Sequence, residues 1–230
     1  MTIVQQSIQE AAFKGDHNLV ASLTTANPDA VRAKDEDGRT ALHWAASGKH
    51  LEITRGLLAA GGDATTADDG GMTPLHIAAS TGSHEIVLLL LEAAPAVIDN
   101  KTESGQTALH YAASKNHAEV VDALLNAGAD PSARDRYGQT PMHRAATRGW
   151  VRIARRLKED TRAKVNVRDA TGNTPLHVAA EDVQIDMIKY LLAEGADADV
   201  ENKEKQRPKD VTTDKAVQAL LAAAVSEDAT

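Results

Sequence analysis

Five histidines recur at a fixed spacing, and they are the residues of this sequence whose type and repetition could do chemistry. Each closes a motif of Thr, then Ala or Pro, then Leu or Met, and they are His43, His76, His110, His143 and His177. Imidazole binds zinc, but every ligand must come within about 2 Å of the ion. Histidines in separate stacked helical repeats lie about 10 Å apart and cannot share one ion. We interpret them as structural hydrogen-bonding groups that tie a turn to a helix.

Other catalytic arrangements are also missing from the sequence. Gly61-Gly62 and Gly70-Gly71 lack the Gly-Lys-Ser/Thr ending of a phosphate-binding loop, and neither Gly-x-Ser-x-Gly nor His-Glu-x-x-His occurs. The chain contains no Cys, which excludes thiolate zinc sites, iron–sulfur clusters and cysteine nucleophiles. We therefore predict a non-enzymatic protein with no cofactor, no catalytic residue and no metal site.

The elements that hold the histidines repeat along the chain. A Thr precedes each His by three residues and is a good helix N-cap, and a Pro that follows fits the first helical position. Gly or Asn ends this first helix, a second helix follows, as in residues 84–91 and 119–125, and Gly- and Asp-rich turns separate the repeats. The period of 33 or 34 residues extends to both ends of the chain, with anchors near Gln6, Thr40, Thr73, Thr107, Thr140, Thr174 and Arg207.

A turn and two helices in about 33 residues resemble the ankyrin repeat. The resemblance implies an all-α ankyrin-repeat solenoid of seven stacked helix-turn-helix repeats, with turn or hairpin tips and a concave binding face. We expect one domain over residues 1–230, in which the atypical first and last repeats cap the stack. Paired alanines, such as Ala45-Ala46 and Ala78-Ala79, let neighbouring helices approach closely. They explain how the core forms in a chain with 3% aromatic residues.

The net charge of −8 is unevenly distributed. Residues 134–168 hold eleven basic residues against three acidic ones, whereas residues 1–115 hold fourteen acidic and eight basic residues. Arg152, Arg155, Arg156 and Lys158 fall on a second helix, where they would keep the outer face solvated. We expect neither nucleic acid nor a membrane as a partner, because the basic segment is flanked by acid and the apolar run at 86–91 is short.

Candidate binding residues are those that differ between repeats at the tips and on exposed first-helix positions. Trp44 and Tyr111 are favoured as aromatic anchors for a partner, although Trp44 could equally pack against the adjacent repeat. The acidic tips at residues 35–37 and 68–69 fit either turn formers or a surface for a basic partner. The predicted partner-binding residues are Asp37, Arg39, Trp44, Asp69, Met72, Tyr111, Lys115, Tyr137, Arg144 and Arg148.

Five segments look more specific than generic ankyrin repeats and are similar to the gankyrin family of proteasome regulatory-particle assembly chaperones. They are residues 35–45, 73–80, 110–116, 142–146 and 200–204. The resemblance implies a chaperone, monomeric when free, that binds the C-terminal domain of one ATPase subunit of the 26S proteasome in the cytoplasm and nucleus. It also implies that Arg39 and Lys115 pair with partner acids, while Asp37 and Asp69 face basic partner residues.

Two positions depart from that family. Residues 178–182 stand where animal members carry a Leu-x-Cys-x-Glu segment, but lack its Leu and Cys, so we do not expect a retinoblastoma-type partner. Met72 stands where the family has a tip aromatic, so the resemblance does not carry over the hydrophobic contact of that ring. The alternative function is a generic ankyrin adaptor that binds a kinase or a transcription-regulatory partner.

Overall fold

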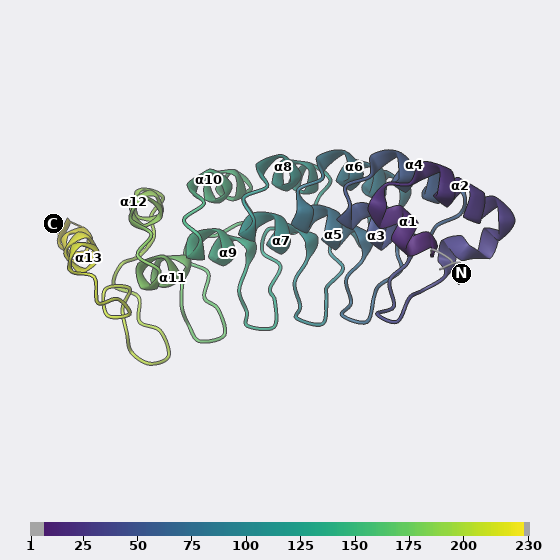
Figure 1. Ribbon diagram of the computed structural model, residues 1–230. Helices are drawn as coiled ribbons and strands as arrows, with labels where there is room; N and C mark the ends of the chain where they lie inside the picture. The colour runs from purple at the N-terminus through teal and green to yellow at the C-terminus, as the bar shows by residue number, and fades with distance from the viewer. Residues whose placement is uncertain (1–6, 228–230) are drawn as a thin grey trace. The chain divides into compact units, whose positions relative to one another are not determined.

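The computed structural model describes residues 7–227, and within them every regular element is a helix (Figure 1). The predicted all-α fold is thereby confirmed. Six pairs of helices come first: α1 (Ile8–Lys14) and α2 (His17–Ala26), α3 (Ala41–Ser47) and α4 (Leu51–Ala59), α5 (Pro74–Thr81) and α6 (His84–Ala93), α7 (Ala108–Ser114) and α8 (Ala118–Asn126), α9 (Pro141–Thr147) and α10 (Val151–Glu159), α11 (Pro175–Glu181) and α12 (Ile185–Ala193). Two 3-10 helices, η1 (Pro28–Arg32) and η2 (Pro95–Val97), and the final helix α13 (Lys215–Glu227) complete the elements.

The chain divides into two compact parts, which we describe separately. The N-terminal block contains the described residues up to Tyr111 together with Asp122–Ala129, and the C-terminal block contains Ala112–Val121 and the described residues from Asp130 onward. The single domain expected over residues 1–230 stays a prediction. None of the helices within residues 7–227 is both long enough and apolar enough to cross a membrane.

The first helices begin where the caps predict. Thr73, Thr140 and Thr174 have extended backbone angles as N-caps, and a Pro occupies the first helical position after each of them. In the first repeat, Ser7 caps α1 by accepting a hydrogen bond from the backbone N–H of Glu10 at 3.1 Å. The anchor predicted at Gln6 lies outside the described residues.

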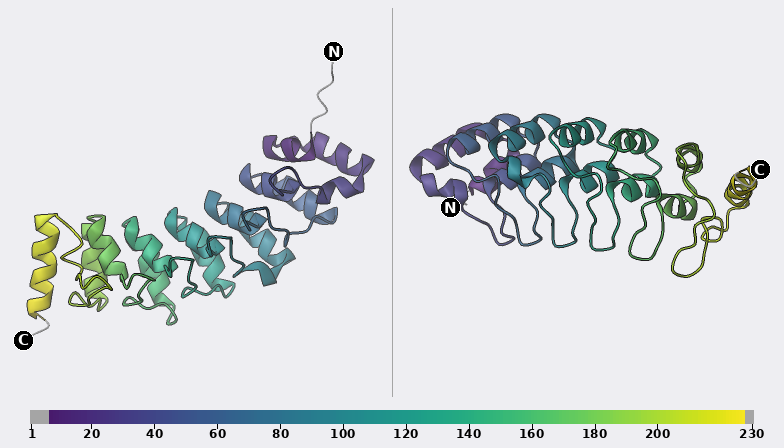
Figure 2. Two further views of the ribbon diagram at one scale, coloured as in Figure 1. Left: turned by 90° about the horizontal axis from the view of Figure 1, so that it is seen from below. Right: turned by 180° about the vertical axis from the view of Figure 1, so that it is seen from behind.

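Alanine pairs in the first helices and larger apolar side chains of both helices form the core of each block. The alanine pairs of five first helices are completely buried: Ala45-Ala46, Ala78-Ala79, Ala112-Ala113, Ala145-Ala146 and Ala179-Ala180. In the N-terminal block α3 packs between α1 and α5, and in the C-terminal block α9 packs beside α11 (Figure 2). The second helices cover these first helices with Ile, Leu and Met side chains, such as Ile53 and Leu57 of α4.

The histidines link each repeat to the next. The Nδ1 atom of His43 accepts a hydrogen bond from the backbone N–H of Thr40 at 3.1 Å, so the ring carries its proton on Nε2. Nε2 then donates to the backbone carbonyl of Met72 in the following repeat at 3.0 Å. The same bridge ends on three other carbonyls: His76 on Asn100, His143 on Asn173, and His177 on Gln206. The structural interpretation of these histidines is therefore confirmed.

Most turns between repeats are closed by an Asp or Asn side chain. Asp35 Oδ1 accepts from the backbone N–H groups of Asp37 and Arg39 at 3.0 and 2.8 Å. The equivalent side chains make the same pair of bonds in four further turns: Asp68, Asp135, Asp169 and Asn202. Neighbouring tips are joined by single backbone hydrogen bonds, as from the N–H of Asp69 to the carbonyl of Asp37 at 3.0 Å. Asp35 and Asp68 are thus turn formers, as one of the two interpretations predicted.

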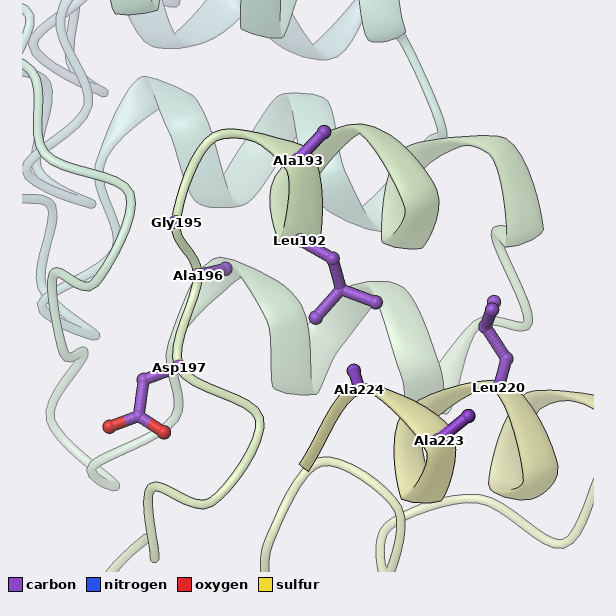
Figure 3. Close-up of a pocket in the computed structure, with 8 residues that line it drawn as sticks. All are labelled: Leu192, Ala193, Gly195, Ala196, Asp197, Leu220, Ala223 and Ala224. Carbon is purple, nitrogen blue, oxygen red and sulfur yellow. The ribbon is translucent and has the colours of Figure 1, made fainter. Parts of the chain in front are cut away.

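The seventh repeat differs from the expected pair of helices. The backbone N–H of Arg207 donates to Asp210 at 2.9 Å, which reproduces the anchor bond, but only one α-helix, α13, follows. Residues 211–213 are Val-Thr-Thr, which are poor helix formers, and Asp214 caps α13 by accepting from the N–H of Val217. A pocket of about 430 Å³ lies between α12 and α13, where Leu192 points toward Ala224 (Figure 3). The small alanines of α13 leave this space open.

Each turn between the two helices of a repeat contains one residue with a left-handed backbone. Nine residues past the anchor, Gly82 and Gly149 have φ angles of 76° and 70°, and Asn116 has 62°. Val183 occupies the same position with φ of 56°. A β-branched residue is strained in this conformation, because its side chain crowds the backbone.

Val183→Gly is expected to raise the free energy of unfolding by about 1 kcal/mol, because glycine has no Cβ and adopts the left-handed conformation without strain. Val183 is 41% exposed, so little buried apolar contact is lost. Denaturant titration of both proteins measures the change. Val183→Ala is the matched control and should gain less, since its Cβ remains. Equal or lower stability of the glycine variant would show that the left-handed position carries no strain.

The histidine bridges also predict a pH dependence of stability. Burial penalises the charged imidazolium and lowers the pKa of His143 from 6.5 to about 4. Between these values the unfolded chain binds a proton that the folded chain does not, so the free energy of unfolding falls as the pH falls. His143→Gln should reduce this slope by up to about 1.4 kcal/mol per pH unit. Denaturant titrations at several pH values measure it, and an unchanged slope would contradict the neutral bridge.

The chain offers its own precedent for that variant. Gln9 occupies the histidine position of the first repeat and donates through Nε2 to the carbonyl of Ala33 at 3.0 Å. Glutamine can therefore make the link to the next repeat without a titratable group. His84→Gln, which removes a half-buried imidazole with no hydrogen bond in the described part of the chain, controls for the loss of one histidine.

Candidate partner-binding surface

A groove of about 200 Å³ lies between α3 and α5 in the N-terminal block. Three predicted binding residues, Arg39, Trp44 and Met72, line it together. Its other lining residues are His43, Ser47, Ile77, Ser80 and Thr81. Ile77 is buried. The groove therefore has an aromatic wall, an apolar floor and one cation at its edge.

Trp44 is held by three contacts. Its ring packs edge-on against Phe13 of the first repeat, with centroids 5.5 Å apart and an interplanar angle of 77°. Its Nε1–H donates to Asp35 Oδ2 at 2.6 Å, and the guanidinium of Arg39 lies 5.3 Å from the ring centroid. The half-buried ring thus packs against the adjacent repeat, as one interpretation predicted, and it also lines the groove. Its role as a partner anchor stays a prediction.

Arg39 is fixed at the rim of the groove. Its Nε donates to Asp68 Oδ2 at 3.1 Å, and its side chain is 33% exposed. Its two terminal amino groups make no hydrogen bond within residues 7–227. Burial alone would raise the pKa of the Asp68 carboxyl, but backbone N–H donors and Arg39 outweigh it and hold the pKa below its ordinary value. Asp68 therefore stays ionised and fixes the orientation of the Arg39 side chain.

The tips beside the groove present acid. Asp37 and Asp69 are exposed, and neither carboxylate makes a hydrogen bond within the described residues. The backbone of Met72 is used twice, since its N–H donates to Asp68 and its carbonyl accepts from His43, while its side chain faces the groove. The N-terminal block thus sets two unpaired carboxylates next to a cation and an apolar groove.

Two aromatic residues extend this surface in different ways. Tyr111 is half-buried, with its ring edge-on to His76 at a centroid distance of 6.0 Å, and it does not line the groove. Phe13 is 46% exposed and was missed by sequence reasoning, which treated the first repeat only as a cap. Its position, seven residues past the anchor, holds Ser47 and Ser80 in later repeats. An aromatic residue at that polar position was the available signal.

The remaining four predicted residues lie in the C-terminal block. Tyr137 is 64% exposed at a tip, and Lys115 and Arg148 are exposed just after α7 and α9. Arg144 is instead half-buried and pairs with the buried carboxylate of Asp135. Its position corresponds to that of Trp44, whose indole makes the same kind of bond to Asp35.

The polar and apolar groups of these surfaces are of the kinds that make contacts with another protein. Within residues 7–227 no three side chains of His, Cys, Asp or Glu are arranged to hold a metal ion. The groove and tips of the N-terminal block offer ionic and apolar contacts that are already oriented by the turns. Such an arrangement suits a protein surface with complementary charges.

The sequence matches known proteins along most of its length. A family model described as ankyrin repeats (3 copies) matches residues 8–100, 68–135 and 128–202. The probable 26S proteasome regulatory subunit p28 of Saccharomyces cerevisiae is 32% identical over 166 residues, which cover 70% of this chain and 73% of that protein. The 26S proteasome non-ATPase regulatory subunit 10 of Homo sapiens is 42% identical over 63 residues, 27% of this chain and 28% of that protein.

Two further matches are a toxin and a solved ankyrin repeat domain. Alpha-latrocrustotoxin-Lt1a of Latrodectus tredecimguttatus is 35% identical over 88 residues. These residues cover 38% of this chain and 6% of the toxin. The solved ankyrin repeat domain of human ASB11 superposes with a TM-score of 0.83 at 25% identity, over 94% of this chain and 96% of that one. The chain belongs to the ankyrin-repeat family and, within it, is related to the proteasome regulatory subunit p28 of yeast.

Proposed function

We propose that this protein is an assembly chaperone of the 26S proteasome regulatory particle and binds the C-terminal domain of one ATPase subunit. The observation that supports this most is the groove of the N-terminal block, where Arg39, Trp44 and Met72 lie beside the free carboxylates of Asp37 and Asp69. The relationship to yeast p28 over 70% of the chain supplies the proteasome as the setting.

The proposed interface separates two tasks. Arg39 is oriented by Asp68 and can pair with a partner carboxylate through its terminal amino groups, while Asp37 and Asp69 can pair with partner cations. Such rim charges act mainly on the rate and register of association. The groove lined by Trp44 and Met72 can receive an apolar side chain and thereby slow dissociation.

Bound to one ATPase subunit, the protein adds bulk to the regulatory ring. This bulk restrains premature docking of the ring onto the core particle until assembly is complete. The protein acts as a free monomer before it binds, in the cytoplasm and nucleus where proteasomes assemble. Microscopy of a tagged chain tests the proposed location in the cytoplasm and nucleus. Light scattering gives the mass of the free protein and tests whether it is a monomer.

Arg39→Glu combined with Lys115→Glu is expected to weaken binding to the isolated ATPase C-terminal domain by about tenfold or more, because two attractive pairs become repulsive. Titration calorimetry with each of the ring ATPase domains measures the affinity. The far-ultraviolet helical signal should be unchanged. If the unmodified protein binds none of these domains, the proposal fails, and recovery of a kinase or transcription regulator indicates the adaptor function instead.

Asp68 and Asp69 are adjacent in sequence and offer a matched pair of variants. Asp68→Ala removes the acceptor of two backbone N–H groups and of Arg39, so it should lower the free energy of unfolding by about 2 kcal/mol or more. Asp69→Ala removes an exposed carboxylate and should change it by less than about 0.5 kcal/mol while weakening binding to the ATPase domain. Denaturant titration and calorimetry on both variants test this division, which fails if Asp69→Ala leaves the affinity unchanged.

A further inference from the structure

The outer face of α10 carries a concentration of positive charge. Arg152 and Arg155 are exposed, and Arg156 and Lys158 are half-buried beside them. Lys189 of α12 is also exposed, and it occupies the same position of its repeat as Arg155 does in the preceding one. Because α10 and α12 pack against each other, these cations belong to one surface of the C-terminal block.

Arg152 reverses the charge that other second helices place at the same point. The second residue of α4, α6, α8 and α12 is acidic: Glu52, Glu85, Glu119 and Asp186. An acid there complements the partial positive charge of a helix N-terminus, whereas a cation opposes it. The first turn of α10 contains no acid. Its stability as a helix is therefore lower than acidic residues would make it.

The like charges of α10 also repel one another. Arg152 lies three and four residues before Arg155 and Arg156, a spacing that puts all three on one helix face. Arg156 lies 3.6 Å from Glu159, and Arg155 sits 5.3 Å from the ring centroid of Tyr190. Arg152 has no ion pair or hydrogen bond within the described part of the chain. The repulsion is relieved only in part.

Solvation of the face does not require this arrangement. Acidic residues keep a surface equally soluble, and the chain already has a net charge of −8. A basic patch at a helix start therefore has a cost in stability and no gain in solubility. Its chemistry fits a ligand with several negative charges, because guanidinium groups bind carboxylates through two parallel hydrogen bonds.

We propose that the outer face of α10, with Lys189 of α12, is a second interaction surface that binds an acidic segment of a protein partner. The nine residues of α10 span about 13 Å, which suits a short peptide. Glu159 lies 3.6 Å from Arg156 and Glu194 lies 3.9 Å from Lys158, so acids border the cations at this end of the surface and would repel a long polyanion such as a nucleic acid. The surface lies on second helices of the C-terminal block and shares no residue with the groove of the N-terminal block.

Binding of a fluorescein-labelled oligoglutamate peptide to the full-length chain tests the proposal by fluorescence anisotropy. We expect saturable binding at low salt that weakens as salt is added. Arg152→Glu with Arg155→Glu should reduce the affinity by about tenfold or more. The same variant should unfold at an equal or higher denaturant concentration, because it restores an acid to the start of α10. If Arg152 and Arg155 had only a structural role, the double variant would change the stability of the protein and leave its affinity for the peptide unchanged.

Lys14→Glu with Arg55→Glu is the matched control, since it makes the same change in net charge at two exposed cations of the N-terminal block. The affinity of this control for the peptide should stay within about twofold of that of the unmodified chain, because only the long-range effect of the net charge remains. Absence of peptide binding, or equal loss in both double variants, overturns the proposal. Tighter binding of a single-stranded oligonucleotide of equal charge, lost on Arg152→Glu with Arg155→Glu, also overturns it and assigns the surface to nucleic acid.

Discussion

The hydrogen bond from a buried imidazole to the carbonyl of the next repeat is the interaction on which the rest of the structure depends. Each ring accepts from its own threonine and donates to a neighbouring turn, as His43 does to Met72. Nδ1 accepts a hydrogen bond and therefore carries no proton, whereas Nε2 donates one and therefore does. The ring must for that reason be neutral and in a single tautomer. The bridge therefore fixes where each turn sits relative to the preceding helix, and the fixed spacing of the motif follows from that requirement.

The same turns orient the candidate binding residues. In each Asp-closed turn one carboxylate oxygen holds the backbone, which leaves the second oxygen for a side chain. That second oxygen receives Trp44 at Asp35, Arg39 at Asp68 and Arg144 at Asp135. Side chains held in this way lose little rotational freedom when a partner arrives, which favours affinity for a given contact area. Under the proposed function, folding and recognition share the same carboxylates, so replacing one of them is expected to change both.

The sequence predicted the backbone well because its signals are local. Thr, Pro and Gly at fixed offsets determine caps and turns, and the alanine pairs mark the closely packed helices. The side-chain partners of Arg39 and Arg144 could not be predicted, because each lies across a turn whose closure brings the groups together. The single helix of the seventh repeat was missed for a related reason: its anchor matches the period, but the residues after it favour extended structure. The left-handed backbone at Val183 was not predicted, because glycine or asparagine usually signals such a turn and this position holds valine.

Charge is distributed so that the two proposed surfaces do not compete for one ligand. The groove of the N-terminal block combines one cation with two free carboxylates, so it selects a partner that carries both signs in the matching order. The outer face of α10 is mostly basic, and the acids Glu159 and Glu194 at its end would limit a ligand to a short anionic segment. A uniformly acidic protein is repelled by the tips of the first surface, and a uniformly basic one by the second. Discrimination between partners thus comes from repulsion as much as from attraction, and it follows from substitutions at tips and second helices that leave the histidine bridges unchanged.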